Sequence, residues 1–591
     1  MKKSVIFLLS FLVIFVILFS QNFSNVRIFL WDNDNGLTFQ DPDNPDKYIG
    51  YEENLRQSFA ILGFSKDSHN LDINSTLPPI EELLLYGAVF VTCGPRLALT
   101  TIISQSDIDK LKEYLDSGGC LYLEGNNIAD YLDRTDKNFL NYYFNNYLLY
   151  SGGTNYSYVE TVYTDTTSNF CRYYEFVYPA GTPPDYSIDQ LGNFYGIGEP
   201  YYYPFLVFNA KGKLYRSTAT AYTPPESKAP YYFPGKTVMQ TTDFGAYAFP
   251  YKQGKDIPDS MKNILIRTSY LRDILRFFSI GRTLVIQDDG QVAKATYELL
   301  KALNNNGIEY YYINLKSTAT YPNYTFLSKF TTVILYTGEY GEPFILPDDT
   351  FNLQRYLTYG GNILVSGENL AQSYGIPGQN VQTDEFPFLA YFLWIDYRSS
   401  IYDDVFFTAD KTSFYSLNPY TSLIQQVEAT SSKVDYVMPF PRDTFVNVNY
   451  YLGKSKAPIY VGVNNIAKTH KSVFFGFPIE YIDYKNLDQL IKETFSNFFD
   501  YDLEFTLTRT NENSRKDIII KQQESKGKIY LSGNKIILEN INSAKLVDCN
   551  GRILKTLYQG ENDLKDLGKS GIFFVVYKDN NINKNFKFIK F

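Results

Sequence analysis

The sequence predicts two tandem doubly wound parallel-sheet α/β domains with β-rich insertions, followed by a small antiparallel β-sandwich. Three observations predict this fold class: an internal repeat, the order of apolar segments within each copy, and a change of pattern near residue 501. A chain of 591 residues is also too long for a single hydrophobic core, so several domains are expected.

The repeat opens with an apolar strand that ends on carboxylates. Residues 26–36 read VRIFLWDNDNG, and residues 282–290 read RTLVIQDDG. A helix follows in each copy, at 51–63 and 295–303, because apolar residues recur there at helical spacing and a glycine closes the pattern.

Each copy then has an apolar strand, a second helix, and a Gly-Gly pair that leads into another strand. The strands lie at 86–92 and 120–123 in copy one, and at 330–337 and 362–365 in copy two. Continuous apolar runs of this length are typical of parallel strands buried on both faces. The alternation of strand and helix predicts a doubly wound sheet with right-handed crossovers.

A long stretch rich in Tyr, Thr and Pro follows in each copy, at about 151–235 and 385–465. Alternating residues there predict β-hairpins, either inserted into the unit or laid beside it. A strand and an amphipathic helix close each copy, so we place copy one at 24–279 and copy two at 280–500. From 501 to 591 short strands alternate with Gly and Asn turns, which indicates an antiparallel sandwich.

The N-terminus has the pattern of a secretory signal peptide. Lys2 and Lys3 precede an apolar run at 5–19, and Ser20 stands before the polar switch. We expect residues 1–20 to be removed on export, which places the protein outside the cell or on its surface. A retained membrane anchor is the alternative, although the run is shorter than the about 20 residues of a usual span.

Composition excludes some classes of function. The net charge of −9 and the pI near 5.1, without clustered Lys and Arg, argue against nucleic-acid binding. The 17% aromatic content favours packing on large β surfaces, with a carbohydrate-binding platform as the alternative.

The few His and Cys residues argue against a zinc site, because the chain has only two His and no CxxC pair. We expect Cys93 and Cys120 to be buried thiols, while a disulfide between neighbouring strands stays possible.

The C-terminal segment, about 525–591, resembles the type A C-terminal sorting domain of the type IX secretion system. The residues that carry the resemblance read AKLVDCNGRILK at 544–555, SGIFFVV at 570–576 and KFIKF at 587–591. Phe573 departs from the Tyr that the family usually has. The resemblance implies delivery across the outer membrane by the type IX machinery as a partner, with the tail removed afterwards.

The two copies resemble the class I glutamine-amidotransferase-like, or flavodoxin-like, modules of secreted proteins. The shared features are the opening strand with its carboxylates, the Gly-Gly pair, and a late Phe-Gly strand. In the active enzymes of that family a Cys stands on an elbow after the third apolar strand. Here the elbow position falls on Glu124 in copy one and on Ser366 in copy two.

Ser366 and His470 are the only candidates for a catalytic pair. A Ser nucleophile needs a positioned base and a group that orients the base, and no acid flanks His470. Copy one has no equivalent of His470. We therefore expect no catalytic residues and no bound organic cofactor.

The carboxylates after the first strand of each copy are candidate metal ligands. Asp32 and Asp34 in copy one, and Asp288 and Asp289 in copy two, stand where ligands of open α/β sheets bind. Close carboxylates could hold Ca²⁺. The alternative, which the pattern favours, is that Asp and Asn form an Asx turn as the chain leaves the strand.

These patterns together favour a secreted or surface-displayed, non-enzymatic binding or structural protein. Its expected ligand is a surface polysaccharide or another protein. A hydrolase acting on peptide or glycan, and an accessory subunit of a peptidase, are the alternatives.

Overall fold

In the computed structural model the chain divides into two compact units, one holding both α/β copies and the other holding the C-terminal strands. The structure describes residues 25–67, 69–95, 100–150, 161–164, 174–177, 188–194, 202–210, 213–224, 233, 235–248, 259–288, 296–315, 321–338, 347–367, 370–374, 388–402, 407–409, 433–439, 446–452, 459–479, 482, 484–501, 528–532, 535–548, 553–563, 571–579 and 582–590.

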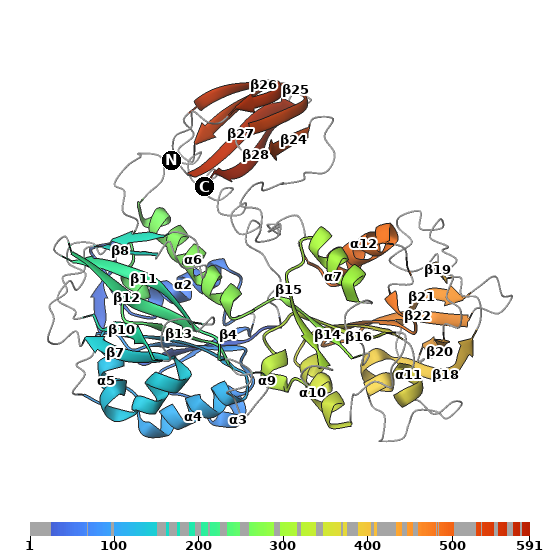
Figure 1. The fold of residues 1–591 in the computed structure, drawn as a ribbon, viewed down its shortest axis with the longest axis horizontal. Helices are drawn as coiled ribbons and strands as arrows, with labels where there is room; N and C mark the ends of the chain where they lie inside the picture. The colour runs from blue at the N-terminus through green and yellow to red at the C-terminus, as the bar shows by residue number, and fades with distance from the viewer. Residues whose placement is uncertain are drawn as a thin grey trace. The chain divides into compact units, whose positions relative to one another are not determined.

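Copy one is built on a nine-stranded sheet of mixed direction (Figure 1). Its parallel part has the order β4-β1-β5-β6-β13, and antiparallel strands β12, β11, β8 and β9 extend it at one edge. The bounds are β1 (Ile28–Asp32), β4 (Leu71–Asn74), β5 (Ala88–Thr92), β6 (Cys120–Glu124), β8 (Thr161–Thr164), β9 (Glu175–Val177), β11 (Tyr202–Ala210), β12 (Lys213–Tyr222) and β13 (Thr237–Gln240). Numbered along the chain, the parallel strands follow the flavodoxin-like order 2-1-3-4-5.

Copy two repeats this arrangement in an eight-stranded sheet. The order is β15-β14-β16-β17-β23 for the parallel strands, and β22, β21 and β19 extend them antiparallel. The bounds are β14 (Thr283–Gln287), β15 (Tyr310–Asn314), β16 (Thr332–Gly338), β17 (Asn362–Gly367), β19 (Phe407–Ala409), β21 (Val446–Leu452), β22 (Ile459–Ile466) and β23 (Lys471–Phe475). The predicted tandem α/β fold class is confirmed.

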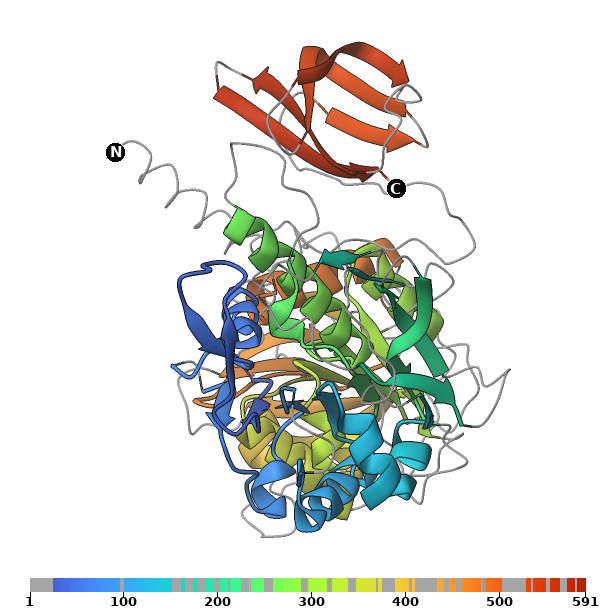
Figure 2. The same ribbon diagram turned by 90° about the vertical axis from the view of Figure 1, so that its left-hand side faces the viewer.

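Helices cover both faces of each parallel sheet, as a doubly wound fold requires. In copy one, α2 (Glu53–Ile61) and α6 (Asp259–Phe277) lie on one face, while α3 (Ile80–Leu83), α4 (Gln105–Asp116) and α5 (Ile128–Thr135) lie on the other, which both views show (Figures 1 and 2). Alternate residues of β1 point to the two helical layers. Ile28 and Leu30 pack with α2 and α6, whereas Phe29 and Trp31 pack with α4 and α5.

In copy two the corresponding helices are α7 (Thr296–Asn305) and α12 (Tyr484–Glu493) on one face, and α9 (Tyr324–Leu327), α10 (Pro347–Thr358) and α11 (Leu370–Tyr374) on the other (Figure 1).

The β-rich insertions do both things that the sequence allowed. Some of their strands join the main sheet, and two others in each copy form a separate two-stranded ribbon. The ribbon consists of β7 (Asn146–Tyr150) and β10 (Gln190–Asn193) in copy one, and of β18 (Ile395–Tyr402) and β20 (Lys433–Pro439) in copy two. A π-helical turn precedes each ribbon, η1 (Phe139–Tyr143) and η5 (Phe388–Leu393).

The Gly-Gly pairs have a packing role that is the same in both copies. The ring of Tyr114 lies directly against Gly119, where an added Cβ would stand 2.1 Å from Cζ, and the Tyr114 hydroxyl donates to the Tyr86 carbonyl at 2.9 Å. Tyr356 does the same at Gly361, with a Cβ distance of 2.2 Å. Only glycine lets the tyrosine of the preceding helix close over the start of the strand.

The C-terminal unit is an all-antiparallel, five-stranded sheet. Its strands are β24 (Lys528–Ser532), β25 (Lys535–Asp548), β26 (Ile553–Asp563), β27 (Gly571–Asp579) and β28 (Ile582–Lys590). The predicted Asn-Gly turn falls between the paired strands β25 and β26, but residues 549–552 lie outside the described residues.

Cys93 and Cys120 are buried and free, so the thiol prediction is confirmed. The predicted leader lies outside the described residues. Among the residues that the structure describes, no helix has the length and apolar character to cross a bilayer.

We expect Gly119→Ala to destabilise copy one, because the added methyl overlaps the Tyr114 ring. Overpacking of this kind costs about 1–3 kcal/mol, which thermal unfolding should register as a lower midpoint. Gly361→Ala should cost a similar amount in copy two, and Gly119→Ala should cost much less in a Tyr114→Ala background. An unchanged midpoint in Gly119→Ala would contradict this packing.

Candidate functional site

The carboxyl edge of the first sheet is the place where this fold binds ligands. In an open α/β sheet the crevice lies outside the strand ends at the topological switch point, which in the 2-1-3-4-5 order falls between the first and third strands. Those strands are β1 and β5. β1 ends at Asp32, so Asp32, Asn33 and Asp34 lie at the switch point.

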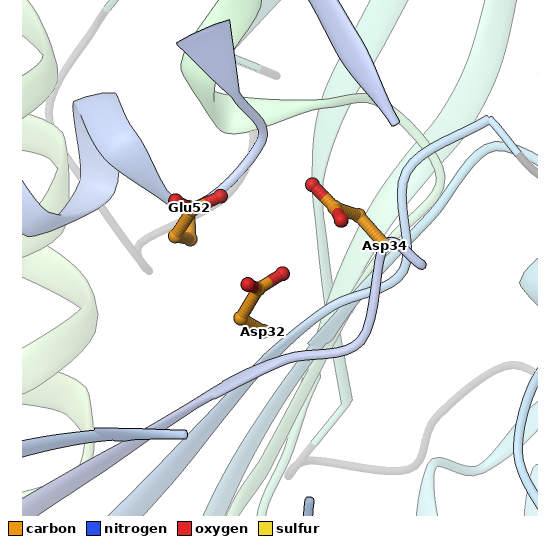
Figure 3. Close-up of side chains that lie close together, drawn as sticks. All are labelled: Asp32, Asp34 and Glu52. Carbon is orange, nitrogen blue, oxygen red and sulfur yellow. The ribbon is translucent and has the colours of Figure 1, made fainter. Parts of the chain in front are cut away.

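Three carboxylates meet there. Oxygen atoms of Asp32, Asp34 and Glu52 all lie within 4.8 Å of one another. Figure 3 shows the three side chains directed toward one another, two from the end of β1 and one from the start of α2. The structure thus adds Glu52 to the two acids that the sequence analysis selected.

A short hairpin brings Glu52 to the strand end. The chain turns through β2 (Thr38–Gln40) and β3 (Tyr48–Gly50) before entering α2. The Glu52 carboxylate lies close over Gly50, where an added Cβ would stand 2.2 Å from Oε2, so a side chain there would displace the carboxylate. A Glu at the first turn of a helix is commonly explained by the helix dipole, which is why the sequence did not single it out.

Asp34 is fixed by the backbone. Its Oδ1 accepts the Gly36 N–H at 2.7 Å, which is the Asx turn that the pattern favoured, and its Oδ2 accepts the Tyr51 N–H at 3.1 Å. Each carboxylate oxygen has a second lone pair, so these bonds leave room for a cation. The turn and the metal-site interpretations are therefore compatible.

Asp32 is less well satisfied. Its Oδ1 is buried and has no hydrogen-bond partner. Burial, reinforced by the charge of Asp34, raises the pKa of Asp32 to about 6. Burial together with the charges of Asp32 and Asp34 raises the pKa of Glu52 to about 7. Within the described part of the chain none of these three acids forms an ion pair.

Two more acids, Asp243 and Glu124, lie near this group. Asp243 is buried, and burial with the charges of Glu124 and Asp34 raises its pKa well above the usual range. With its amide turned to donate, Asn126 reaches Asp243 Oδ2 at 2.7 Å. The raised pKa values mean that these acids favour their protonated forms, so an oxygen-seeking cation would have to displace protons from the carboxyl groups it binds.

The switch point of copy two has a different composition. Strand register places Gln287 opposite Tyr336, as Asp32 stands opposite Thr92, so Gln287 corresponds to Asp32 and Asp288 to Asn33. The Gln287 amide oxygen accepts a hydrogen bond from the Tyr312 hydroxyl. Asp288 is buried, and Asp289 lies outside the described residues. Copy two thus has a neutral, hydrogen-bonded side chain where copy one has a carboxylate.

The two elbow residues make one equivalent structural bond. Glu124 Oε2 accepts the Phe244 N–H at 3.0 Å and the Tyr122 hydroxyl at 2.6 Å. Ser366 Oγ accepts the Ile479 N–H at 2.8 Å and donates to the Phe477 carbonyl at 3.0 Å. Both side chains are fully buried, and each accepts a hydrogen bond from a backbone N–H group of the loop after the fifth parallel strand.

The structure does not bring Ser366 and His470 together. Ser366 pairs with Phe475 at the end of β17, whereas His470 precedes the start of β23. Five residues of extended chain, about 16 Å, separate these levels. His470 Nε2 bonds the Phe392 carbonyl at 2.9 Å, and burial lowers its pKa.

The helix that follows each elbow is capped by an acid from the insertion. Asp189 Oδ2 accepts the Asp130 N–H at 2.9 Å, and Asp435 Oδ2 accepts the Ala371 N–H at 3.0 Å. Both acids are fully buried. The backbone N–H groups at the start of these helices are thereby satisfied by the protein itself.

The fold and this edge define a tandem flavodoxin-like α/β protein whose first copy has an acidic switch point. No family model matches the chain, and no curated protein matches its sequence.

Solved structures resemble parts of it. A putative ThuA-like protein from Bacteroides uniformis is 13% identical, with coverage of 36% of this chain and 88% of its own, at a TM-score of 0.24. The carbohydrate deacetylase Agd3 is 14% identical, with coverage of 34% and 30%, at a TM-score of 0.24. The N-terminal domain of mmIFT52 is 14% identical, with coverage of 37% and 98%, at a TM-score of 0.26. Likeness at this level assigns no activity.

We expect Glu124→Gln to remove a pH dependence of stability. Burial raises the pKa of Glu124 from 4.5 to about 8. Folding therefore takes up a proton between these values, and stability falls as pH rises through that window, by at most about 1.4 kcal/mol per pH unit. The unfolding midpoint of Glu124→Gln, relative to the natural protein, should rise from pH 5 to pH 8.

Ser366→Ala is the matched control for this measurement, because it removes the equivalent bonds without removing a titratable group. Its loss of stability should be the same at both pH values. A Glu124→Gln difference that is flat from pH 5 to pH 8 would show that the carboxyl is already ionised.

Proposed function

We propose that this chain is a secreted or surface-displayed, non-enzymatic binding protein whose first α/β copy binds a divalent cation, Ca²⁺ in the first instance, through Asp32, Asp34 and Glu52. The observation that carries the proposal is the convergence of these three acids at the switch point of copy one, where the described part of copy two has Gln287 in the position of Asp32. In this proposal the ligand of the protein binds by coordinating the cation.

The chemistry of the site favours a hard cation. All candidate donors are oxygens, and Ca²⁺ takes six to eight oxygen ligands in flexible geometry. Two oxygens of Asp34 are already engaged by backbone N–H groups, so the protein alone fills only part of that shell. The open positions are available to water or to an oxygen-rich ligand.

We propose a non-enzymatic protein because the side chains at the two elbow positions, Glu124 and Ser366, are held in backbone hydrogen bonds. Glu124 and Ser366 each accept an equivalent backbone N–H group. His470, the histidine of copy two, precedes the start of β23, whereas Ser366 pairs with Phe475 at the end of that strand. A nucleophile has to be free to attack, and these two side chains are held by the backbone.

Delivery to the surface completes the proposal. Residues 1–20 would direct export, and residues 525–591 would be read by the type IX machinery. The all-antiparallel character of the C-terminal unit supports this role for the tail, since a sorting domain of that type is a β structure.

We expect calorimetry to detect one Ca²⁺ per chain, with a Kd of about 10⁻⁴–10⁻³ M, the range of extracellular modules. Asp32→Asn and Glu52→Gln should each abolish the heat of binding, since each removes one carboxylate of the group. Asp288→Asn, in the corresponding loop of copy two, is the matched control and should bind Ca²⁺ as the natural protein does. Undiminished binding in Asp32→Asn would refute the site.

The affinity for Ca²⁺ should fall as pH decreases below about 7. Because the pKa of Asp32 is about 6 and that of Glu52 about 7, both acids carry protons at pH 5 that a cation must displace. Titrations at pH 8 and pH 5 should therefore differ by about tenfold or more in Kd. Equal constants at the two pH values would mean that other groups hold the ion.

Mass spectrometry of protein recovered from the cell surface should show an N-terminus near residue 21 and a C-terminus before about residue 525. Surface protein that retains residues 525–591 would contradict the processed tail. A matched variant truncated after 524 should accumulate inside the outer membrane if the tail is the delivery signal.

A further inference from the structure

A second surface of copy one has unusual chemistry. Four large apolar side chains are exposed on the β7–β10 ribbon and the turn before it: Tyr142 is 51% exposed, Tyr147 37%, Leu149 42% and Phe194 36%. We call these four residues the aromatic face. It is separate from the acidic switch point and has no part in the proposed cation site.

The ribbon geometry places these side chains together. Tyr147 and Leu149 are two residues apart on β7, so they point to the same side. Gly192 pairs with Tyr147, and a Cβ on it would stand 2.3 Å from Tyr147 Cζ, so the tyrosine ring lies across the glycine. The rings of Tyr142 and Phe194 meet edge to face at 5.4 Å.

The other side of the ribbon anchors it to the main sheet. Asn146 is buried and donates to Thr220 Oγ1 of β12 at 2.8 Å. Phe194 is held where the ribbon begins, because its N–H donates to the Asn145 carbonyl at 2.9 Å. The aromatic face therefore has a fixed backbone, which lowers the entropic cost of binding.

The aromatic face is uncharged. Residues 138–150 and 190–194 contain no Asp, Glu, Lys or Arg, and their polar groups are amides and tyrosine hydroxyls. The chain as a whole has a net charge of −9, so most of its surface would favour a cationic partner. This uncharged surface has no such preference. Its charge character matches a ligand that has apolar faces and hydroxyl groups but no ionised groups.

The size of the face argues against a protein partner. Four side chains of roughly 200 Å² each, at these exposed fractions, offer on the order of 300 Å². A stable protein interface needs about 800 Å² from each partner. A few sugar rings, whose C–H faces stack on aromatic rings, match the smaller area.

Copy two supplies an internal comparison. Trp394 and Asn145 share a left-handed backbone before the ribbon, so Tyr391 corresponds to Tyr142, Asp396 to Tyr147, and Arg398 to Leu149. Tyr391 is also exposed, at 41%, but Asp396 and Arg398 form an ion pair at 2.7 Å. The second ribbon thus has charges where the first has apolar side chains.

We infer that the aromatic face of copy one is a binding site for a neutral polysaccharide. The face and its ligand are independent of the cation, so binding should persist in EDTA. This property separates the inference from the proposed function, because each can fail alone.

Affinity electrophoresis of the full chain in gels containing dextran, mannan, laminarin or xyloglucan tests the inference. We expect retardation by at least one of these neutral polysaccharides, with and without EDTA, and none by the polyanion alginate. Tyr147→Ala should weaken binding about tenfold or more, as loss of an aromatic anchor does, while Tyr147→Phe should retain it. Tyr391→Ala, the matched variant in copy two, should bind like the natural protein.

Three results would overturn the inference. These are no retardation in any of the four gels, equal retardation of Tyr147→Ala and the natural protein, or self-association that Tyr147→Ala abolishes, which would assign the face to a second copy of the chain. Unfolding midpoints of the variants show whether a loss of binding reflects a loss of fold.

Discussion

A backbone N–H group buried beyond the fifth parallel strand needs an acceptor, and the side chain at the end of the fourth strand provides it in both copies. Glu124 and Ser366 have little chemistry in common, yet each accepts the equivalent N–H, from Phe244 and Ile479. A buried donor left without a partner costs about 1–3 kcal/mol, so this position is constrained by satisfaction of the backbone. The same bond holds the side chain at the elbow position in each copy.

The two copies keep one scaffold and differ at its edges. Both retain the strand order, the Gly-Gly pair beneath a tyrosine, the elbow bond and a capping acid from the insertion. They differ where Asp32 is replaced by Gln287, and where the apolar ribbon of copy one becomes an ion pair in copy two. The described residues of the two copies thus share the scaffold and differ in the side chains at the switch point and on the ribbon.

Much of the fold followed from the sequence, because strands buried on both faces and helices closed by glycine have strong local patterns. The edge strands β4 and β15 were not foreseen, since an edge strand such as Leu71–Asn74 is short and half polar. Asp32 and Asp34, which the sequence named as candidate ligands, lie close together at the sheet edge. Glu52 was not named, because its approach depends on the β2–β3 hairpin. The correspondence of Asp32 with Gln287 comes from the strand register, because the sequence alone named the acids of each copy without pairing them one by one.

Whether the cation proposed for copy one binds there is tested most directly by terbium luminescence under tryptophan-selective excitation. The chain has two tryptophans, Trp31 beside Asp32 and Trp394 in copy two. Sensitised emission should saturate at one Tb³⁺ per chain, disappear in Trp31→Phe, persist in Trp394→Phe, and be displaced by Ca²⁺. Emission that survives Trp31→Phe but is lost in Trp394→Phe would place the ion in the other copy and contradict the asymmetry described above.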